Sequence, residues 1–123
     1  MESFTSIPSQ DSPEVVLNKD KGIFKIIGNS FSEDPFTLYA RIFSWLKEYL
    51  KNPLEETNFE FKLNYINTAS SKQIVEILKL LKILKQNRKV VVSWYYQEGD
   101  DDTLTEGEEL SKMFNLDFEF IEY

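Results

Sequence analysis

An almost unbroken apolar run places the tightest constraint on what this chain can fold into. Val90–Tyr96 is interrupted only by Ser93 and follows the cations Arg88 and Lys89. A short run rich in β-branched and aromatic residues is typical of a strand in the middle of a sheet, with a neighbour on each edge and cover over most of both faces. The rest of the chain is therefore expected to supply further strands and packed helices.

Other apolar patterns supply these elements. Val15–Leu17 and Ile23–Ile27 flank a turn that ends at Gly22, which predicts a hairpin. Apolar and polar residues alternate over Phe59–Tyr65 and again around Phe118–Phe120, which predicts two strands with one solvated face. Helical spacing and end signals predict three helices, from Pro35 to before Pro53, from near Ser70 to Leu84, and from a capping box at Thr103–Glu106 to Phe114.

The resulting order is ββαβαβαβ, which indicates an α/β fold with a mixed sheet of about five strands and three helices on one side. Residues 1–12 are polar and Ser-rich, so we expect a flexible lead-in followed by one domain over residues 13–123. Strand–helix–strand crossovers give parallel neighbours and bring the helix starts to one edge of the sheet. Functional residues of open α/β sheets are concentrated at that edge.

Composition argues against several classes of function. The formal charge of -7 disfavours binding to nucleic acid, which depends on clustered Lys and Arg. The absence of Cys and His removes thiolate nucleophiles, disulfides and the commonest metal ligands and general bases. No stretch approaches the roughly 20 apolar residues of a membrane span. We therefore expect a cytoplasmic protein with no nucleic acid or membrane partner, no cofactor and no bound metal.

Three hydroxyl side chains gather at the start of the second predicted helix. Thr68, Ser70 and Ser71 directly follow a predicted strand, and Lys72 comes behind them. A first helical turn has unpaired N–H groups and the positive end of the helix dipole, both of which favour an added phosphate. The alternative is that Asn67 or Thr68 simply caps the helix. The two interpretations are compatible, because modifying a capping hydroxyl changes the same electrostatics.

Several stretches of the chain also match one family in their order and spacing. They are Gly-Asn-Ser-Phe-Ser-Glu-Asp-Pro at 28–35, Trp45-Leu46, Tyr65-Ile-Asn-Thr-Ala-Ser-Ser-Lys72, Trp94-Tyr95-Tyr96 and Asp101-Asp-Thr-Leu-Thr-Glu-Gly-Glu108. From Ile23 onward the chain resembles the SiaC family of regulatory phosphoproteins, whose architecture is related to that of the STAS-type anti-sigma factor antagonists. Two positions depart from the family pattern. Ala69 stands where a small hydroxyl residue is expected, and Ser32 stands where proline is expected.

The resemblance implies a STAS-like regulatory domain that is not an enzyme. It implies that a protein kinase phosphorylates the Thr of the Asn-Thr-x-Ser-Ser-Lys segment, which is Thr68 here, and that a metal-dependent serine/threonine phosphatase removes the phosphate. The unphosphorylated form is then expected to bind and activate a diguanylate cyclase, which raises cyclic di-GMP and promotes biofilm growth or aggregation. Phosphate at Thr68 is expected to block this binding. The expected docking face consists of the starts of the second and third helices, namely Asn67, Ser70, Ser71, Lys72, Asp101, Asp102 and Glu106.

Two other classes of function stay open from the residues alone. A constitutive adaptor would bind its partner through exposed aromatic residues such as Trp94 or Tyr96. A small carboxylate-based enzyme needs two carboxylates that converge in a pocket, and the adjacent acidic pairs of this sequence do not share a helix face. The acidic loop Glu98–Asp102 does not match a calcium-binding loop, so we interpret it as a solvated loop leading into a helix.

Overall fold

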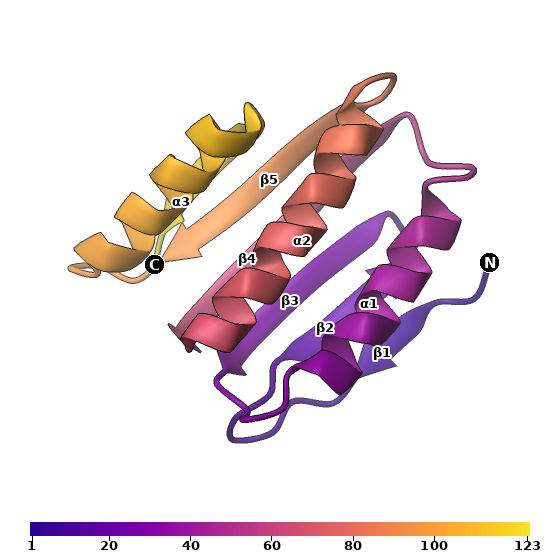
Figure 1. The fold of residues 1–123 in the computed structure, drawn as a ribbon. Helices are drawn as coiled ribbons and strands as arrows, with labels where there is room; N and C mark the ends of the chain where they lie inside the picture. The colour runs from indigo at the N-terminus through magenta and orange to yellow at the C-terminus, as the bar shows by residue number, and fades with distance from the viewer.

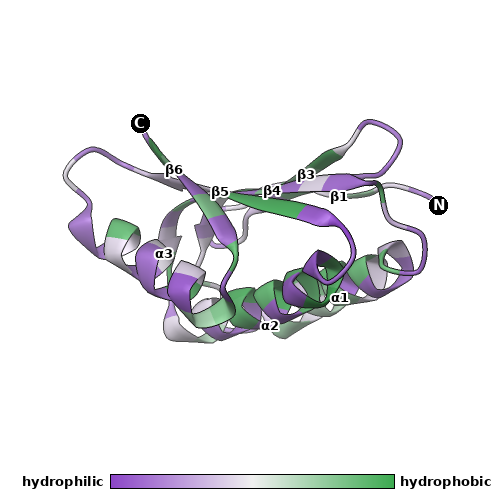
Figure 2. Ribbon diagram, turned by 90° about the horizontal axis from the view of Figure 1, so that it is seen from above, coloured by the Kyte–Doolittle hydropathy of each residue, from purple (hydrophilic) through white to green (hydrophobic).

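A six-stranded sheet carries three helices on one face, as Figures 1 and 2 show. The computed structural model describes residues 1–123. The strands are β1 (Phe4–Ser6), β2 (Glu14–Asn18), β3 (Ile23–Ser30), β4 (Glu56–Ile66), β5 (Lys89–Tyr96) and β6 (Asp117–Glu122). The helices are α1 (Phe36–Tyr49), α2 (Thr68–Lys85) and α3 (Asp101–Phe114).

The strands lie side by side in chain order, and the sheet is mixed. β1, β2 and β3 are antiparallel, whereas β3, β4, β5 and β6 are parallel and are joined through α1, α2 and α3. The predicted α/β fold with a mixed sheet, three helices and one uncovered face is confirmed. Because the crossovers join parallel strands, the carboxyl ends of β4 and β5 and the starts of α2 and α3 come to the same edge.

The sheet has one strand more than the sequence pattern predicts. The added strand is β1, which lies within residues 1–12 and pairs with β2. Its Phe4 ring lies 5.1 Å from the guanidinium carbon of Arg41, and the indole N–H of Trp45 donates to the carbonyl oxygen of Glu2 at 2.7 Å. A three-residue strand is too short to show periodicity, and these anchoring groups belong to α1, far along the chain.

β5 has a neighbour on each edge, as its apolar run predicts, but helices cover only one of its faces. Val92 and Trp94 are buried on the helix side, whereas Val91 and Tyr95 on the other face are half-buried. The predicted interior position of β5 is confirmed, since it is the fifth of six strands, and the prediction of cover over both faces is wrong. Long side chains of the neighbouring strand shield the open face instead, since the Lys62 ammonium lies 5.5 Å from the centroid of the Tyr95 ring.

The core lies between the helices and the sheet face that they cover. The alternating pattern of β4 buries Phe59 and Phe61, whose ring centroids are 4.9 Å apart, and Phe61 lies 5.6 Å from the ring of Trp94. Burial of each such ring contributes roughly 1.5–3 kcal/mol. The helices add Tyr39, Ile42, Leu46, Tyr49, Ile74, Ile77, Leu78, Leu81, Leu84, Leu110 and Phe114. None of the three helices combines the length and the apolar character needed to cross a membrane.

The start of α1 agrees with its prediction to within one residue. The Asp34 carboxylate accepts hydrogen bonds from the backbone N–H of Phe36 at 3.1 Å and from the hydroxyl of Thr37 at 3.2 Å. Pro35, which lies between Asp34 and Phe36, already has helical backbone angles. The carboxylate of Asp34 therefore accepts from an otherwise unpaired N–H group of the first turn. The proline ring fixes the backbone angle φ at the start of the helix.

The start of α3 differs from its predicted capping box. Asp100 caps the helix, because its carboxylate accepts from the backbone N–H of Thr103 at 3.1 Å and from its hydroxyl at 2.7 Å. Asp101 and Asp102 consequently lie in the first turn, where the helix dipole favours negative charge. The prediction of a box at Thr103 and Glu106 is wrong, since an acidic side chain three residues earlier takes the capping role.

Candidate functional site

The starts of α2 and α3 lie together at the edge where the parallel strands end (Figure 1). At this edge is a hollow of about 370 Å³ whose walls come from the end of β4 and the start of α3. It is lined by Leu63, Asn64, Tyr65, Ile66, Asp100, Asp102, Thr103 and Glu106. The lining contains three carboxylates and no basic side chain, so the hollow has a negative local charge.

Asn67 fixes the first turn of α2 to the loop that follows β3. Its side-chain oxygen accepts from the backbone N–H of Ser70 at 2.9 Å, which caps the helix. Its side-chain nitrogen donates to the carbonyl oxygen of Ser32 at 3.1 Å, and its backbone N–H donates to that of Ser30 at 3.1 Å. Of the two capping residues considered from the sequence, Asn67 is the cap and Thr68 is the first helical residue.

We expect Asn67→Ala to lower the free energy of unfolding by about 1–2 kcal/mol, because the variant loses both the cap and the bond to Ser32. Urea denaturation measures this difference. Asn67→Asp is the matched control, since its carboxylate retains the capping acceptor but cannot donate to Ser32, and we expect a loss below about 1 kcal/mol. Equal stability of the parent and both variants would show that this amide does not hold the edge together.

The three hydroxyl side chains predicted to gather here have different surroundings. Ser70 is fully buried, and its oxygen accepts from the hydroxyl of Ser30 at 2.8 Å. Ser30 also lies 2.9 Å from the hydroxyl of Tyr39, whose pKa is raised by burial. Ser71 is half-buried and hydrogen-bonded, whereas Thr68 is exposed and its side chain makes no hydrogen bond. Only Thr68 therefore presents a free hydroxyl to the surroundings.

Glu106 connects the starts of α2 and α3. Its carboxylate accepts from the hydroxyl of Ser71 at 3.3 Å. Burial raises the pKa of Glu106 above its ordinary value of 4.5, the Ser71 hydrogen bond opposes part of this rise, and the negative charges of Glu109 and Asp100 add to it. The charged carboxylate is therefore held at this position against an electrostatic cost.

We expect Glu106→Gln to raise the free energy of unfolding at pH 7, because the amide keeps an acceptor for Ser71 and removes a disfavoured charge. The gain is expected to stay below about 1 kcal/mol, since solvent screens the half-exposed group. A raised folded-state pKa contributes stability that is complete below the unfolded value of 4.5 and is lost as pH rises through the folded value. Urea denaturation at pH 4 and pH 7 should therefore show the gain only at pH 7, and a larger gain at pH 4 would contradict this.

The other predicted docking residues at this edge are solvated. Lys72, Asp101 and Asp102 are exposed and make no hydrogen bond or ion pair, and Asp102 lines the hollow. Asn67, Ser70, Ser71 and Glu106 are instead held by the hydrogen bonds described above. The structure thus separates the predicted residues into a bonded framework and free charges available to a partner.

Comparison with known proteins identifies the family of this chain. The model of the family described as "SiaC family regulatory phosphoprotein" matches residues 7–123. The chain belongs to the SiaC family. The membership predicted from the sequence motifs is confirmed, and it makes the chain one of a family of regulatory phosphoproteins.

One protein and two crystal structures from Pseudomonas aeruginosa are similar to this chain. A protein of strain UCBPP-PA14, described only as uncharacterized, is 26% identical over 113 residues, which are 91% of this chain and 86% of the relative. The crystal structure of apo-SiaC has a TM-score of 0.91 at 23% identity and covers 98% of this chain and 99% of its own. A chain in the crystal structure of diguanylate cyclase SiaD in complex with its activator SiaC has a TM-score of 0.91 at 22% identity, with coverage of 98% and 99%. The two structural likenesses establish a shared fold.

Two exposed aromatic residues beside Asn67 were not identified as functional from the sequence. Phe31 and Tyr65 are 36% and 70% exposed, and their rings meet edge to face with centroids 5.9 Å apart. The alternating pattern of β4 assigns Tyr65 to the helix side, but the register between β3 and β4 shifts between Gly28 and Asn29, so that Tyr65 pairs with Asn29 and Ile66 with the buried Ser30. The extra residue reverses the alternation and places Tyr65 on the face that no helix covers. A shift in strand register depends on the pairing partner, so the alternation within β4 alone could not identify this exposure.

The aromatic residues proposed for an adaptor surface are not the exposed ones. Trp94 is 1% exposed, and its indole N–H donates to the carbonyl oxygen of Thr103 at 2.9 Å. Tyr96 is half-buried. The interpretation of Trp94 as a contact residue is wrong, because α3 packs over it.

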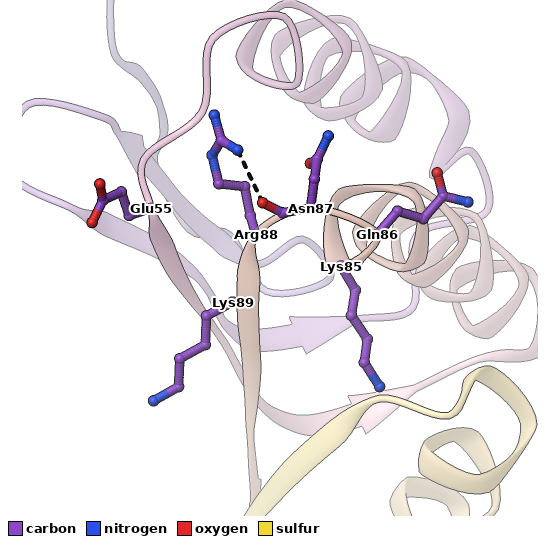
Figure 3. Close-up of a pocket in the computed structure, with 6 residues that line it drawn as sticks. All are labelled: Glu55, Lys85, Gln86, Asn87, Arg88 and Lys89. Carbon is purple, nitrogen blue, oxygen red and sulfur yellow. Dashed lines mark hydrogen bonds between the residues drawn. The ribbon is translucent and has the colours of Figure 1, made fainter.

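The opposite edge of the sheet has a larger hollow of about 610 Å³, shown in Figure 3. It is lined by Glu55, Lys85, Gln86, Asn87, Arg88 and Lys89. Glu55 is its single carboxylate, so no pair of carboxylates converges there. Lys85 lies in the last turn of α2, where a cation complements the helix dipole. The structure also contains no group of three acidic side chains placed to hold a metal ion.

Proposed function

We propose that this chain is a non-enzymatic switch protein whose docking to a diguanylate cyclase is controlled by phosphate at Thr68. The observation that carries the proposal is the free, exposed hydroxyl of Thr68 beside two serines that are buried or bonded. A cytoplasmic protein kinase adds the phosphate and a metal-dependent serine/threonine phosphatase removes it. Family membership and the role of SiaC as the activator in the SiaD complex support the choice of partner.

The docking face consists of the exposed Thr68, the aromatic pair Phe31 and Tyr65, and the hollow at the start of α3. The aromatic pair supplies apolar area at the position where the loop after β3 meets the end of β4. The acidic lining and the free Lys72 supply charges that select the partner. In the unphosphorylated state this surface binds and activates the cyclase, which raises cyclic di-GMP and favours biofilm growth or aggregation.

Phosphate blocks this face through its charge and its hydration. A phosphothreonine carries about -1.5 to -2 charges at neutral pH, and an interface must strip water from it before contact. Thr68 lies three positions after Tyr65, and the hollow at the start of α3 is lined by three carboxylates and no basic side chain, so Lys72 is the cation available to compensate the phosphate. A penalty of several kcal/mol is a large part of the roughly 8 kcal/mol that corresponds to micromolar affinity.

Two alternatives predict different observations. A constitutive adaptor would use Phe31 and Tyr65 in the same way but would not respond to a kinase. A carboxylate-based enzyme would use Glu106, whose raised pKa is the feature that such an enzyme requires. The carboxylates of Asp100 and Glu106 are, however, bonded to Thr103 and Ser71 and hold the helix starts in place. This engagement favours the switch.

The proposal is tested by incubating the protein with its kinase and ATP and by locating phosphate through mass spectrometry of the intact chain and its peptides. We expect one phosphate on Thr68, none on Thr68→Ala and normal labelling of Ser71→Ala. A phosphatase should restore the original mass. Absence of label, with a kinase shown active on another family member, would favour the constitutive adaptor.

A further inference from the structure

The contact between Ser71 and Glu106 lies next to the proposed phosphate. Thr68 and Ser71 are three residues apart on α2, so their Cβ atoms lie about 5–6 Å apart on one helix face. Helical side chains tilt toward the N-terminus, which leans Ser71 toward Thr68. The Glu106 carboxylate, 3.3 Å from the Ser71 oxygen, therefore belongs to the immediate surroundings of any group added to Thr68.

These surroundings are already rich in negative charge. The negative charges of Asp100 and Glu109 both repel that of Glu106, and neither residue forms an ion pair with a basic side chain. Lys72 is the nearest cation along α2, and it is exposed and unpaired. A further charge of about -2 on Thr68 would meet a carboxylate that burial already disfavours and that a single hydroxyl holds in place.

We propose that Glu106 is the positioning residue through which phosphate on Thr68 acts on α3. Repulsion between the phosphate and the carboxylate breaks the Ser71–Glu106 hydrogen bond and loosens the first turns of α3. Because α3 supplies one wall of the docking hollow, the partner then loses a preformed surface as well as meeting a new charge. This inference rests on the proposed modification of Thr68 and specifies how that modification is transmitted.

The test uses full-length protein with phosphothreonine incorporated at position 68 during synthesis, so it does not depend on any kinase. Amide hydrogen exchange by NMR is compared with and without phosphate in the parent, in Glu106→Gln and in Glu108→Gln. Glu108 is exposed on the same helix and makes no hydrogen bond to α2. The Glu108→Gln variant therefore removes the same charge as Glu106→Gln without affecting the hydrogen bond to Ser71. In the parent we expect phosphate to accelerate exchange of amides 103–110 by about tenfold.

Glu106→Gln is expected to reduce that acceleration to below about twofold, because a neutral amide is not repelled, whereas Glu108→Gln should retain it. A carboxyl ¹³C titration gives a second readout that a merely structural role would not change. Phosphate should raise the pH at which Glu106 titrates by about one pH unit. The other charged groups that face Glu106 in this titration are Asp100, Glu109 and Lys72. Equal acceleration in Glu106→Gln, or none in the parent, would overturn the inference.

The outcomes separate this inference from the proposed function. If no kinase labels Thr68, or if phosphate leaves cyclase binding unchanged, the proposed function fails while the exchange experiment still decides the role of Glu106. If the kinase labels Thr68 and binding is lost but α3 exchange is unchanged, the proposed function stands and Glu106 is not the positioning residue.

Discussion

Gly107→Ala is expected to lower the free energy of unfolding by about 3 kcal/mol. A Cβ atom at position 107 would lie 2.5 Å from Cδ1 and Nε1 of the Trp94 ring and 2.8 Å from its Cγ. Trp94 cannot move freely, because it is 1% exposed and its indole N–H is bonded to Thr103. Overpacking costs about 1–3 kcal/mol and loss of a buried hydrogen bond about 1–3 kcal/mol, against a helix-propensity gain of about 1 kcal/mol.

Urea or thermal denaturation followed by tryptophan fluorescence measures this effect, and the midpoint temperature should fall by about 10 °C. Thr105→Ala is the matched control, since it changes helix propensity at an exposed position of the same helix and should shift stability by less than about 0.5 kcal/mol. An unchanged midpoint for Gly107→Ala, with an unchanged fluorescence spectrum, would mean that α3 does not pack on Trp94 as described.

Phosphorylation of Thr68 is expected to weaken binding to the cognate diguanylate cyclase by about 100-fold or more, because a doubly charged group must be desolvated at the centre of the docking face. Thr68→Ala should bind as the unphosphorylated parent does, and it should stay bound in the presence of kinase and ATP. Thr68→Asp should weaken binding by a smaller factor, since a carboxylate carries less charge and fewer oxygens. Isothermal titration calorimetry with purified cyclase gives these ratios directly.

Ser44→Asp serves as the control for added charge, because Ser44 is exposed on α1 and lies outside the docking face. Its affinity should equal that of the parent at physiological salt, where charges separated by more than about 8 Å are largely screened. The mechanism is wrong if phosphorylated protein and Thr68→Asp both bind as tightly as the parent. It is also wrong if Ser44→Asp weakens binding as strongly as Thr68→Asp, since net charge would then be responsible.

Sequence patterns succeeded where one segment carried a complete local signal. The alternation in β4 identified Phe59 and Phe61 as buried, because a strand with one covered face imposes a period of two. Asp34 and Pro35 located the start of α1 for a similarly local reason. The patterns failed at β1, whose three residues carry no period, and at α3, where several acidic residues compete for the cap and only the folded backbone selects Asp100.

The order of elements from β2 onward, the α/β class and the cluster of hydroxyls after β4 follow from the sequence, since each depends on residues close together in the chain. Which hydroxyl is free was decided by tertiary contacts. Ser70 is bonded to Ser30, 40 positions away, and Ser71 to Glu106, 35 positions away, so only Thr68 remains exposed and unbonded. Likewise Tyr65 is exposed where the register between β3 and β4 shifts, while Trp94 is covered because α3 packs on β5. Burial is set by packing between distant segments, and local spacing carries no record of which segments meet.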